Sequence, residues 1–96
     1  MTKAKDPGFA NIFDAIEDVP AERENMKLRA SLMVGLLKFM KREKLTQKDA
    51  AKMFGITQPR VSDLVRGKID LFSLDTLVNM ATAAGLQVDM KVRKAA

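Results

Sequence analysis

Between residues 45 and 85 the chain repeats one pattern three times, and this pattern constrains the fold more than any other feature. Each repeat begins with a hydroxyl residue that can cap a helix, continues with apolar residues at helical spacing, and ends at a glycine. The repeats run from Thr46 to Gly55, from Thr57 to Gly67 and from Ser73 to Gly85. Apolar pairs that can form hydrophobic staples flank the caps: Leu45 with Ala50, Ile56 with Val61, and Phe72 with Leu77. The sequence therefore predicts three short helices with defined ends.

Two further helices are predicted ahead of these three. Residues 21–44 carry an apolar stripe wide enough to face a core, formed by Met26, Leu32, Met33, Leu36, Leu37 and Met40. Residues 9–16 have apolar side chains at i, i+3, i+4 and i+7, namely Phe9, Ile12, Phe13 and Ile16. This short amphipathic helix should end before Val19-Pro20, since the residue before a proline disfavours the helical conformation. The predicted fold is mainly α.

The last segment changes its period. In residues 86–93 the apolar Val88, Met90 and Val92 alternate with polar residues, which predicts a β-strand with one apolar face. A lone strand leaves its backbone N–H and C=O groups unpaired. We therefore expect two copies of the chain to pair these strands across a two-fold axis, as a homodimer. The alternative is an unpaired tail.

Length and charge divide the chain into three parts. The 96 residues suffice for one small domain. Residues 1–25 hold three basic and six acidic side chains, a net charge of −3, whereas residues 26–96 hold fourteen basic and six acidic ones, a net charge of +8. We expect an acidic extension at 1–25, a basic helical domain at 26–85 and a dimerisation strand with its tail at 86–96. The contrast suggests two different partners, although charge runs are often only solvated faces.

Composition argues against several classes of protein. The chain has no His, Cys or Tyr, no phosphate-binding glycine loop and no paired acids, so we expect no enzyme, no metal site and no cofactor. No stretch reaches the roughly 18–20 apolar residues that span a bilayer, and no secretory signal begins the chain. Without cysteines the chain also suits a reducing compartment. We expect a cytoplasmic protein with no membrane partner.

Residues Gln47 to Arg66 form a twenty-residue unit that predicts a helix-turn-helix. Ala51 is small at the fifth position, where two helices would cross closely, and Gly55 occupies the ninth, where a tight turn needs a positive φ. The apolar positions that would face the shared core are Ala50, Phe54, Ile56, Val61 and Leu64. These features at fixed offsets are typical of a helix-turn-helix whose second helix enters the major groove of DNA.

The second helix of this unit, residues 57–66, carries the candidate binding residues. If Val61, Leu64 and Val65 face inward, the opposite side presents Gln58, Pro59, Arg60 and Asp63 to the bases. Arg60 can donate two hydrogen bonds to guanine, Gln58 can read adenine or hold a phosphate, and Pro59 can touch a thymine methyl. Asp63 would accept from cytosine or orient Arg60, and we favour the second role. Candidate phosphate contacts are Gln47, Lys48, Thr57, Arg66 and Lys68.

The segments LTQKDAAKMFGITQPRVSDLVRGK and FSLDTLVNMATAAGL together resemble the Cro/C1-type (XRE) helix-turn-helix family. More narrowly, they are similar to the HigA-like antitoxins of bacterial type II toxin–antitoxin pairs. The resemblance covers about residues 26–92 and implies a five-helix, lambda-repressor-like domain that dimerises on a palindromic operator. It also implies a repressor of its own operon that neutralises a small basic ribonuclease toxin. One departure is that Met40 and Val65 stand where many relatives have a buried Arg–Glu pair, an exchange that folds can tolerate.

The acidic extension is the candidate toxin-binding segment. Its apolar residues Phe9, Ile12, Phe13 and Ile16 could dock in a groove of a basic toxin while neighbouring acids meet its charges. The same apolar side chains could instead pack against the long helix. The sequence is also compatible with two other functions: a stand-alone XRE-type regulator without a toxin, and a protein-interaction module.

Overall fold

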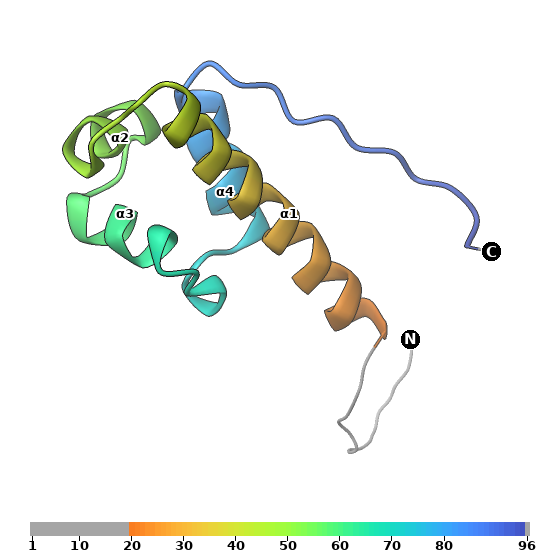
Figure 1. The fold of residues 1–96 in the computed structure, drawn as a ribbon. Coiled ribbons are helices and arrows are strands. Elements are labelled where there is room, and N and C mark those ends of the chain that lie inside the picture. The colour runs from red at the N-terminus through yellow and green to blue at the C-terminus, as the bar shows by residue number, and fades with distance from the viewer. Residues whose placement is uncertain (1–19, 96) are drawn as a thin grey trace.

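The computed structural model describes residues 20–95, which form four α-helices and one 3₁₀ turn. These are α1 (Pro20–Arg42), α2 (Gln47–Phe54), α3 (Gln58–Val65), η1 (Ile69–Leu71) and α4 (Leu74–Ala83). The long α1 crosses α4, while α2 and α3 lie together at one end of the bundle (Figure 1). After α4 the chain leaves the helical body as an extended tail (Figure 1).

The caps predicted for the three short helices are confirmed. The side-chain oxygen of Thr46 accepts a hydrogen bond from the backbone N–H of Asp49 at 3.0 Å, and that of Ser73 accepts from Thr76 at 3.1 Å. Thr57 caps α3 in the same way. Each cap satisfies a backbone donor that the first helical turn leaves free, which is worth about 1 kcal/mol. These local bonds explain why the helices begin where the sequence indicates.

The centre of the core is formed by side chains from α1, α3, α4 and the segment before α4. The largest side chains with less than 2% exposure are Phe72, Leu36, Leu64, Leu77, Met80 and Val61. Full burial of such a side chain stabilises the fold by roughly 1.5–3 kcal/mol. Because they come from α1, α3, α4 and the segment before α4, the core fixes all of these elements against one another.

Two residues expected on the inward faces lie at the surface instead. Met26 is 40% exposed because the first turns of α1 extend beyond the packed core, which begins at Met33. Val65 is 43% exposed, so the prediction that it faces inward is wrong. The buried face of α3 runs through Val61 and Leu64, whereas Val65 lies about 40° beyond Val61 on the side away from Leu64 and is the last residue of the helix.

Neither the five-helix count nor the C-terminal strand is confirmed. Among the described residues there are four α-helices, and the helix predicted at 9–16 lies outside them. Residues 86–95 form no strand within the single chain, because no second segment of the described part pairs with them. The alternating pattern is therefore present in an extended tail that has no backbone partner here.

None of the helices in the described part of the chain is both long enough and apolar enough to span a membrane.

Gly55 and Gly35 allow one substitution to be tested in two backbone conformations. An alanine Cβ at Gly35, within α1, would meet no heavy atom within 4 Å; at Gly55, where φ is +71°, the nearest is the Ala83 Cβ at 4.0 Å. We expect Gly55→Ala to lower the free energy of unfolding by about 1–2 kcal/mol, because an L-residue is strained in the left-handed region. Gly35→Ala should raise it by about 1 kcal/mol, because alanine is the better helix former. Urea unfolding followed by circular dichroism measures both changes, and two changes of the same sign would contradict this explanation.

Candidate nucleic-acid interface

The pair formed by α2 and α3 is held together by small residues and a left-handed turn. Ala50 is fully buried and Ala51 is 9% exposed, so the backbone of α2 can approach its neighbours closely. Gly55 then turns the chain at φ 71°, with its N–H donating to the Ala51 carbonyl. The Ile56 N–H donates to the same carbonyl at 3.0 Å. This arrangement confirms the helix-turn-helix predicted from the spacing.

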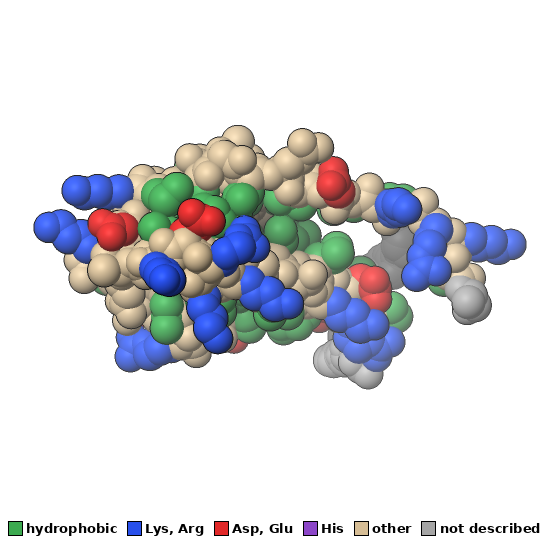
Figure 2. Space-filling model, turned by 45° about the horizontal axis from the view of Figure 1, so that its top comes forward, with side chains coloured by type: hydrophobic (Ala, Val, Ile, Leu, Met, Phe, Trp, Pro, Cys, Tyr) green, Lys and Arg blue, Asp and Glu red, His purple; other side chains and the backbone are tan. Residues whose placement is uncertain are grey.

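The outward side of this pair carries the predicted binding residues. Gln58 and Pro59 are exposed in the first turn of α3, and Arg60 and Asp63 are partly buried on the same helix. The candidate phosphate contacts are all exposed, at the starts of α2 and α3 and just after α3: Gln47, Lys48, Thr57, Arg66 and Lys68. Figure 2 shows Lys and Arg side chains on the helical body, with acidic and apolar side chains between them. The structure thus brings both predicted sets to one end of the bundle.

Arg60 has partners that the sequence did not indicate. Its Nη2 donates a hydrogen bond to the Leu71 carbonyl at 3.0 Å, and its guanidinium carbon lies 4.5 Å from the centroid of the Phe72 ring. In the sequence, Phe72 is marked only as the apolar residue before a helix cap. Nothing in the local sequence signals that its ring would face a side chain twelve positions earlier, because that contact depends on how α3 packs over the loop before α4.

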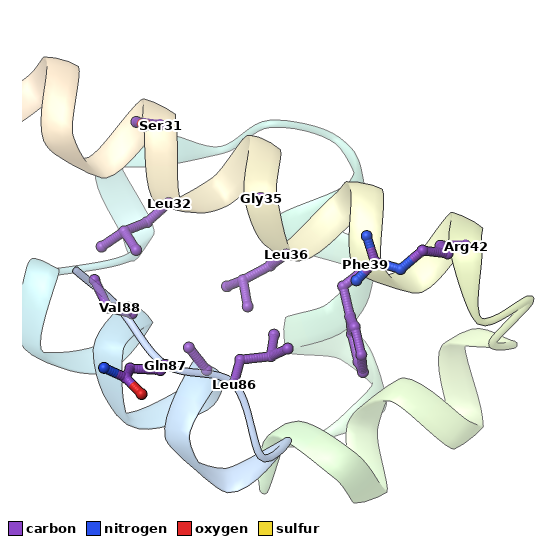
Figure 3. A pocket seen from close by; sticks show the side chains of 10 residues that line it. Ser31, Leu32, Gly35, Leu36, Phe39, Arg42, Leu86, Gln87 and Val88 are labelled. Carbon is purple, nitrogen blue, oxygen red and sulfur yellow. The ribbon is translucent and has the colours of Figure 1, made fainter.

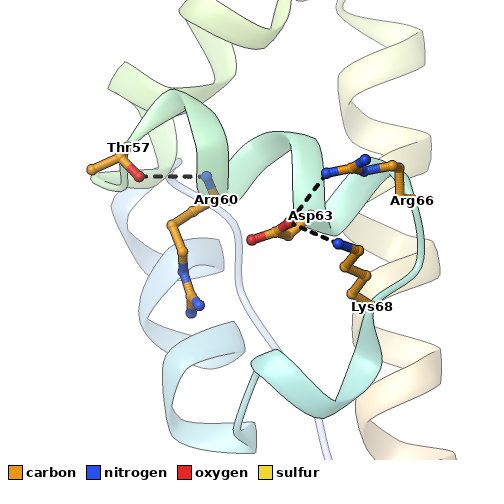
Figure 4. Close-up of polar contacts among 5 residues, drawn as sticks. All are labelled: Thr57, Arg60, Asp63, Arg66 and Lys68. Carbon is orange, nitrogen blue, oxygen red and sulfur yellow. Dashed lines mark hydrogen bonds and ion pairs between the residues drawn. The ribbon is translucent and has the colours of Figure 1, made fainter.

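Asp63 does not orient Arg60, contrary to the favoured prediction. Its Oδ1 lies 3.6 Å from Nη2 of Arg66 and 3.7 Å from Nζ of Lys68, while the Arg60 guanidinium points elsewhere (Figure 4). The reason is the C-terminal turn of α3, which places both cations next to this carboxylate. Such partly exposed ion pairs contribute only about 0–1 kcal/mol to stability, so their main effect is on where the two cations lie.

The predicted dimer residues differ in their surroundings. Val88 is half-buried and packs against the core, whereas Met90 is 65% and Val92 is 93% exposed. Beside Val88, a cavity of about 230 Å³ opens between α1 and the start of the tail, lined mostly by apolar residues such as Leu32 and Phe39 (Figure 3). The outer half of the tail therefore presents apolar side chains without cover in the single chain.

Two other predictions concern sites away from this face. The candidate toxin-binding residues Phe9, Ile12, Phe13 and Ile16 lie outside the residues that the structure describes. Between residues 20 and 95, no group of three or more His, Cys, Asp or Glu side chains is placed to hold a metal ion.

This fold and this basic face define a helix-turn-helix DNA-binding protein. Residues 15–93 match the model of a family described as a helix-turn-helix domain. Among solved structures, a chain described as a candidate transcriptional regulator of the XRE family is 31% identical, with a TM-score of 0.70. The similarity covers 77% of this chain and 83% of that one. No curated protein matches the chain.

The chain therefore belongs to the helix-turn-helix family of XRE transcriptional regulators. Proteins of this class regulate transcription by binding DNA and are generally not enzymes.

Proposed function

We propose that the chain is a sequence-specific repressor that reads an operator with α3 and also serves as the antitoxin of a toxin–antitoxin pair. The proposal that α3 reads DNA rests on the side chains in the first turn of this helix. There Gln58 and Pro59 are exposed, and Arg60 is held beside them by contacts with the loop before α4. Polar and cationic groups at the start of a recognition helix are where base contacts are made in this class of fold.

The outward residues divide into two roles. Arg60 reads guanine through paired hydrogen bonds, Gln58 reads adenine, and Pro59 contacts a thymine methyl. Asp63 remains on the base-facing side and holds Arg66 and Lys68, which contact phosphates, within 3.7 Å. The other phosphate contacts come from the exposed starts of the two helices, at Gln47, Lys48 and Thr57. Phosphate contacts supply affinity for any duplex, and the base contacts supply selectivity.

The substitution Arg60→Ala tests the base-reading assignment. We expect it to weaken binding to the operator by ~1–3 kcal/mol, the usual worth of one paired contact to guanine, while binding to unrelated duplex changes less. The measurement is a competition binding assay at about 150 mM salt, with the operator selected by the wild-type protein from random duplexes.

Lys94→Ala is the matched control, because it removes one cation from the tail, which runs away from α3 (Figure 1). Operator binding should then change by less than about 0.5 kcal/mol, as expected for a cation with no contact to the duplex. Equal affinity of Arg60→Ala and the wild type for the operator would remove Arg60 from the site.

A homodimer is part of this proposal. Two recognition helices read a palindrome when their half-sites lie about one duplex turn, ~34 Å, apart. The tail supports such pairing because Met90 and Val92 are exposed apolar residues on an extended segment with no backbone partner in the single chain. Antiparallel pairing of two tails would pair the backbone groups on their facing edges and bring the apolar side chains of the two tails together on one face.

Met90→Lys tests this pairing. We expect the variant to be monomeric at concentrations where the wild type is dimeric, because two lysines would be brought to the centre of the ribbon. Light scattering after size exclusion gives the mass. Gln87→Lys adds the same charge to the polar face of the tail and should remain a dimer. A wild-type monomer, or a dimeric Met90→Lys, would contradict the role of the tail.

The antitoxin role rests on the acidic extension. Residues 1–25 carry a net charge of −3 and four apolar residues at helical spacing, which suits a groove on a small basic toxin. A stand-alone XRE regulator is equally compatible with the family. A protein-interaction module without DNA binding is the remaining alternative, and the binding assay above distinguishes it.

Removing residues 1–19, which precede α1, tests the antitoxin role. The shortened chain should lose its binding to the product of the neighbouring gene, because the proposed docking residues are gone, while it still binds the operator. Calorimetry with the purified pair gives the first affinity, and the competition assay gives the second. Full-strength binding of the shortened chain to that product would exclude the extension as the docking segment. If the full-length chain binds no such product, it is a stand-alone regulator.

A further inference from the structure

The Arg60 side chain spans two elements that are separate in the sequence. It begins in the first turn of α3 and ends on the loop that runs from η1 to the start of α4. There its guanidinium carbon is 4.5 Å from the Phe72 ring centroid, and Nη2 donates to the Leu71 carbonyl at 3.0 Å. A cation at this distance from an aromatic face is attracted by the negative charge on the face of the ring. The two contacts together define both the position and the direction of the guanidinium.

We propose that Phe72 is a positioning residue that sets operator preference by holding Arg60 in its base-reading orientation. This inference rests on the proposed function and adds to it a residue that lies outside the helix-turn-helix unit. Phe72 is 1% exposed, so it cannot contact DNA itself without leaving the core. Phe72 can therefore influence base recognition only through Arg60, whose guanidinium lies over the Phe72 ring.

The contacts leave Arg60 able to read a base. A guanidinium has five N–H donors, and two of its edges each present a pair of parallel donors. One pair is formed by Nε and Nη2 and the other by Nη1 and Nη2, and each pair uses a different hydrogen of Nη2. The Leu71 carbonyl uses one of these hydrogens, so the other remains with its neighbouring donor as a complete pair. That pair is what guanine O6 and N7 require.

The loop that holds Arg60, which includes η1, is itself fixed. Nη1 of Arg29, on α1, donates to the Ile69 carbonyl at 3.3 Å. The Phe72 N–H donates to the same carbonyl at 3.1 Å, and Ser73 caps α4 immediately afterwards. Because the loop is tied to α1 and α4, it is a rigid support for the guanidinium. A side chain held in place before binding loses less rotamer freedom when DNA arrives.

The test is base discrimination by Phe72→Leu. The readout is the ratio of affinities for the selected operator and for a copy with the Arg60-contacted base pair exchanged. We expect this ratio to fall about three- to tenfold, in line with the loss of the ring contact, while affinity for unrelated duplex stays within about twofold of the wild type. In an Arg60→Ala background the same substitution should not change the ratio further.

Phe39→Leu is the matched control. Phe39 is 8% exposed in α1 and packs against Phe54, so its replacement removes similar volume from the core without touching Arg60. Its discrimination ratio should equal that of the wild type. An unchanged ratio in Phe72→Leu, or an equal fall in Phe39→Leu, would overturn the proposal while leaving DNA binding by α3 intact. If no duplex is selected at all, the proposed function fails instead.

A measurement on the wild-type protein keeps the inference testable even if Phe72→Leu does not fold. The Phe72 ring should shift the nuclear magnetic resonance of the Arg60 Nε–H and Cδ protons upfield, because the guanidinium lies over the ring face. Random-coil shifts for these protons in the free protein would overturn the proposal. An upfield shift that persists on the operator would support it.

Discussion

The close packing of α2 against α3 is the constraint on which the rest of the structure depends. The residues beside this contact are small and buried, at Ala50 and Ala51, and a left-handed turn follows at Gly55, where φ is +71°. A larger residue at either alanine would overpack the core in which Val61 and Leu64 are fully buried. Since these two residues determine which side of α3 faces inward, they also determine which side chains α3 presents outward.

The outward side of α3 is organised by specific contacts as well as by net positive charge. Asp63 lies between Arg66 and Lys68, at 3.6 and 3.7 Å, and Arg60 lies on Phe72. Net positive charge supplies affinity for any duplex, and it is weakened by salt. Fixed directions of the donors supply selectivity, because a base edge accepts hydrogen bonds only along certain lines. The two kinds of interaction therefore come from different residues of one short helix and the loop that follows it.

The loop between α3 and α4 joins the recognition helix to the rest of the bundle. It contacts α1 through Arg29, it contacts α3 through Arg60, and it carries Phe72 into the centre of the core. A change in this loop would therefore reach the DNA-binding face even though its backbone lies beyond the helix-turn-helix unit. The loop is part of the site for this reason, although its residues carry no motif of their own.

The sequence by itself determined the mainly helical fold, the ends of the three short helices and the helix-turn-helix. Caps, glycines and apolar spacing act over four or five residues, so they can be read along the chain. Only the tertiary structure decided that Val65 lies outside, that Asp63 pairs with Arg66 and Lys68, and that Arg60 rests on Phe72. These outcomes depend on how separate elements are rotated and brought together, because a side chain chooses its partner among groups that local spacing does not specify.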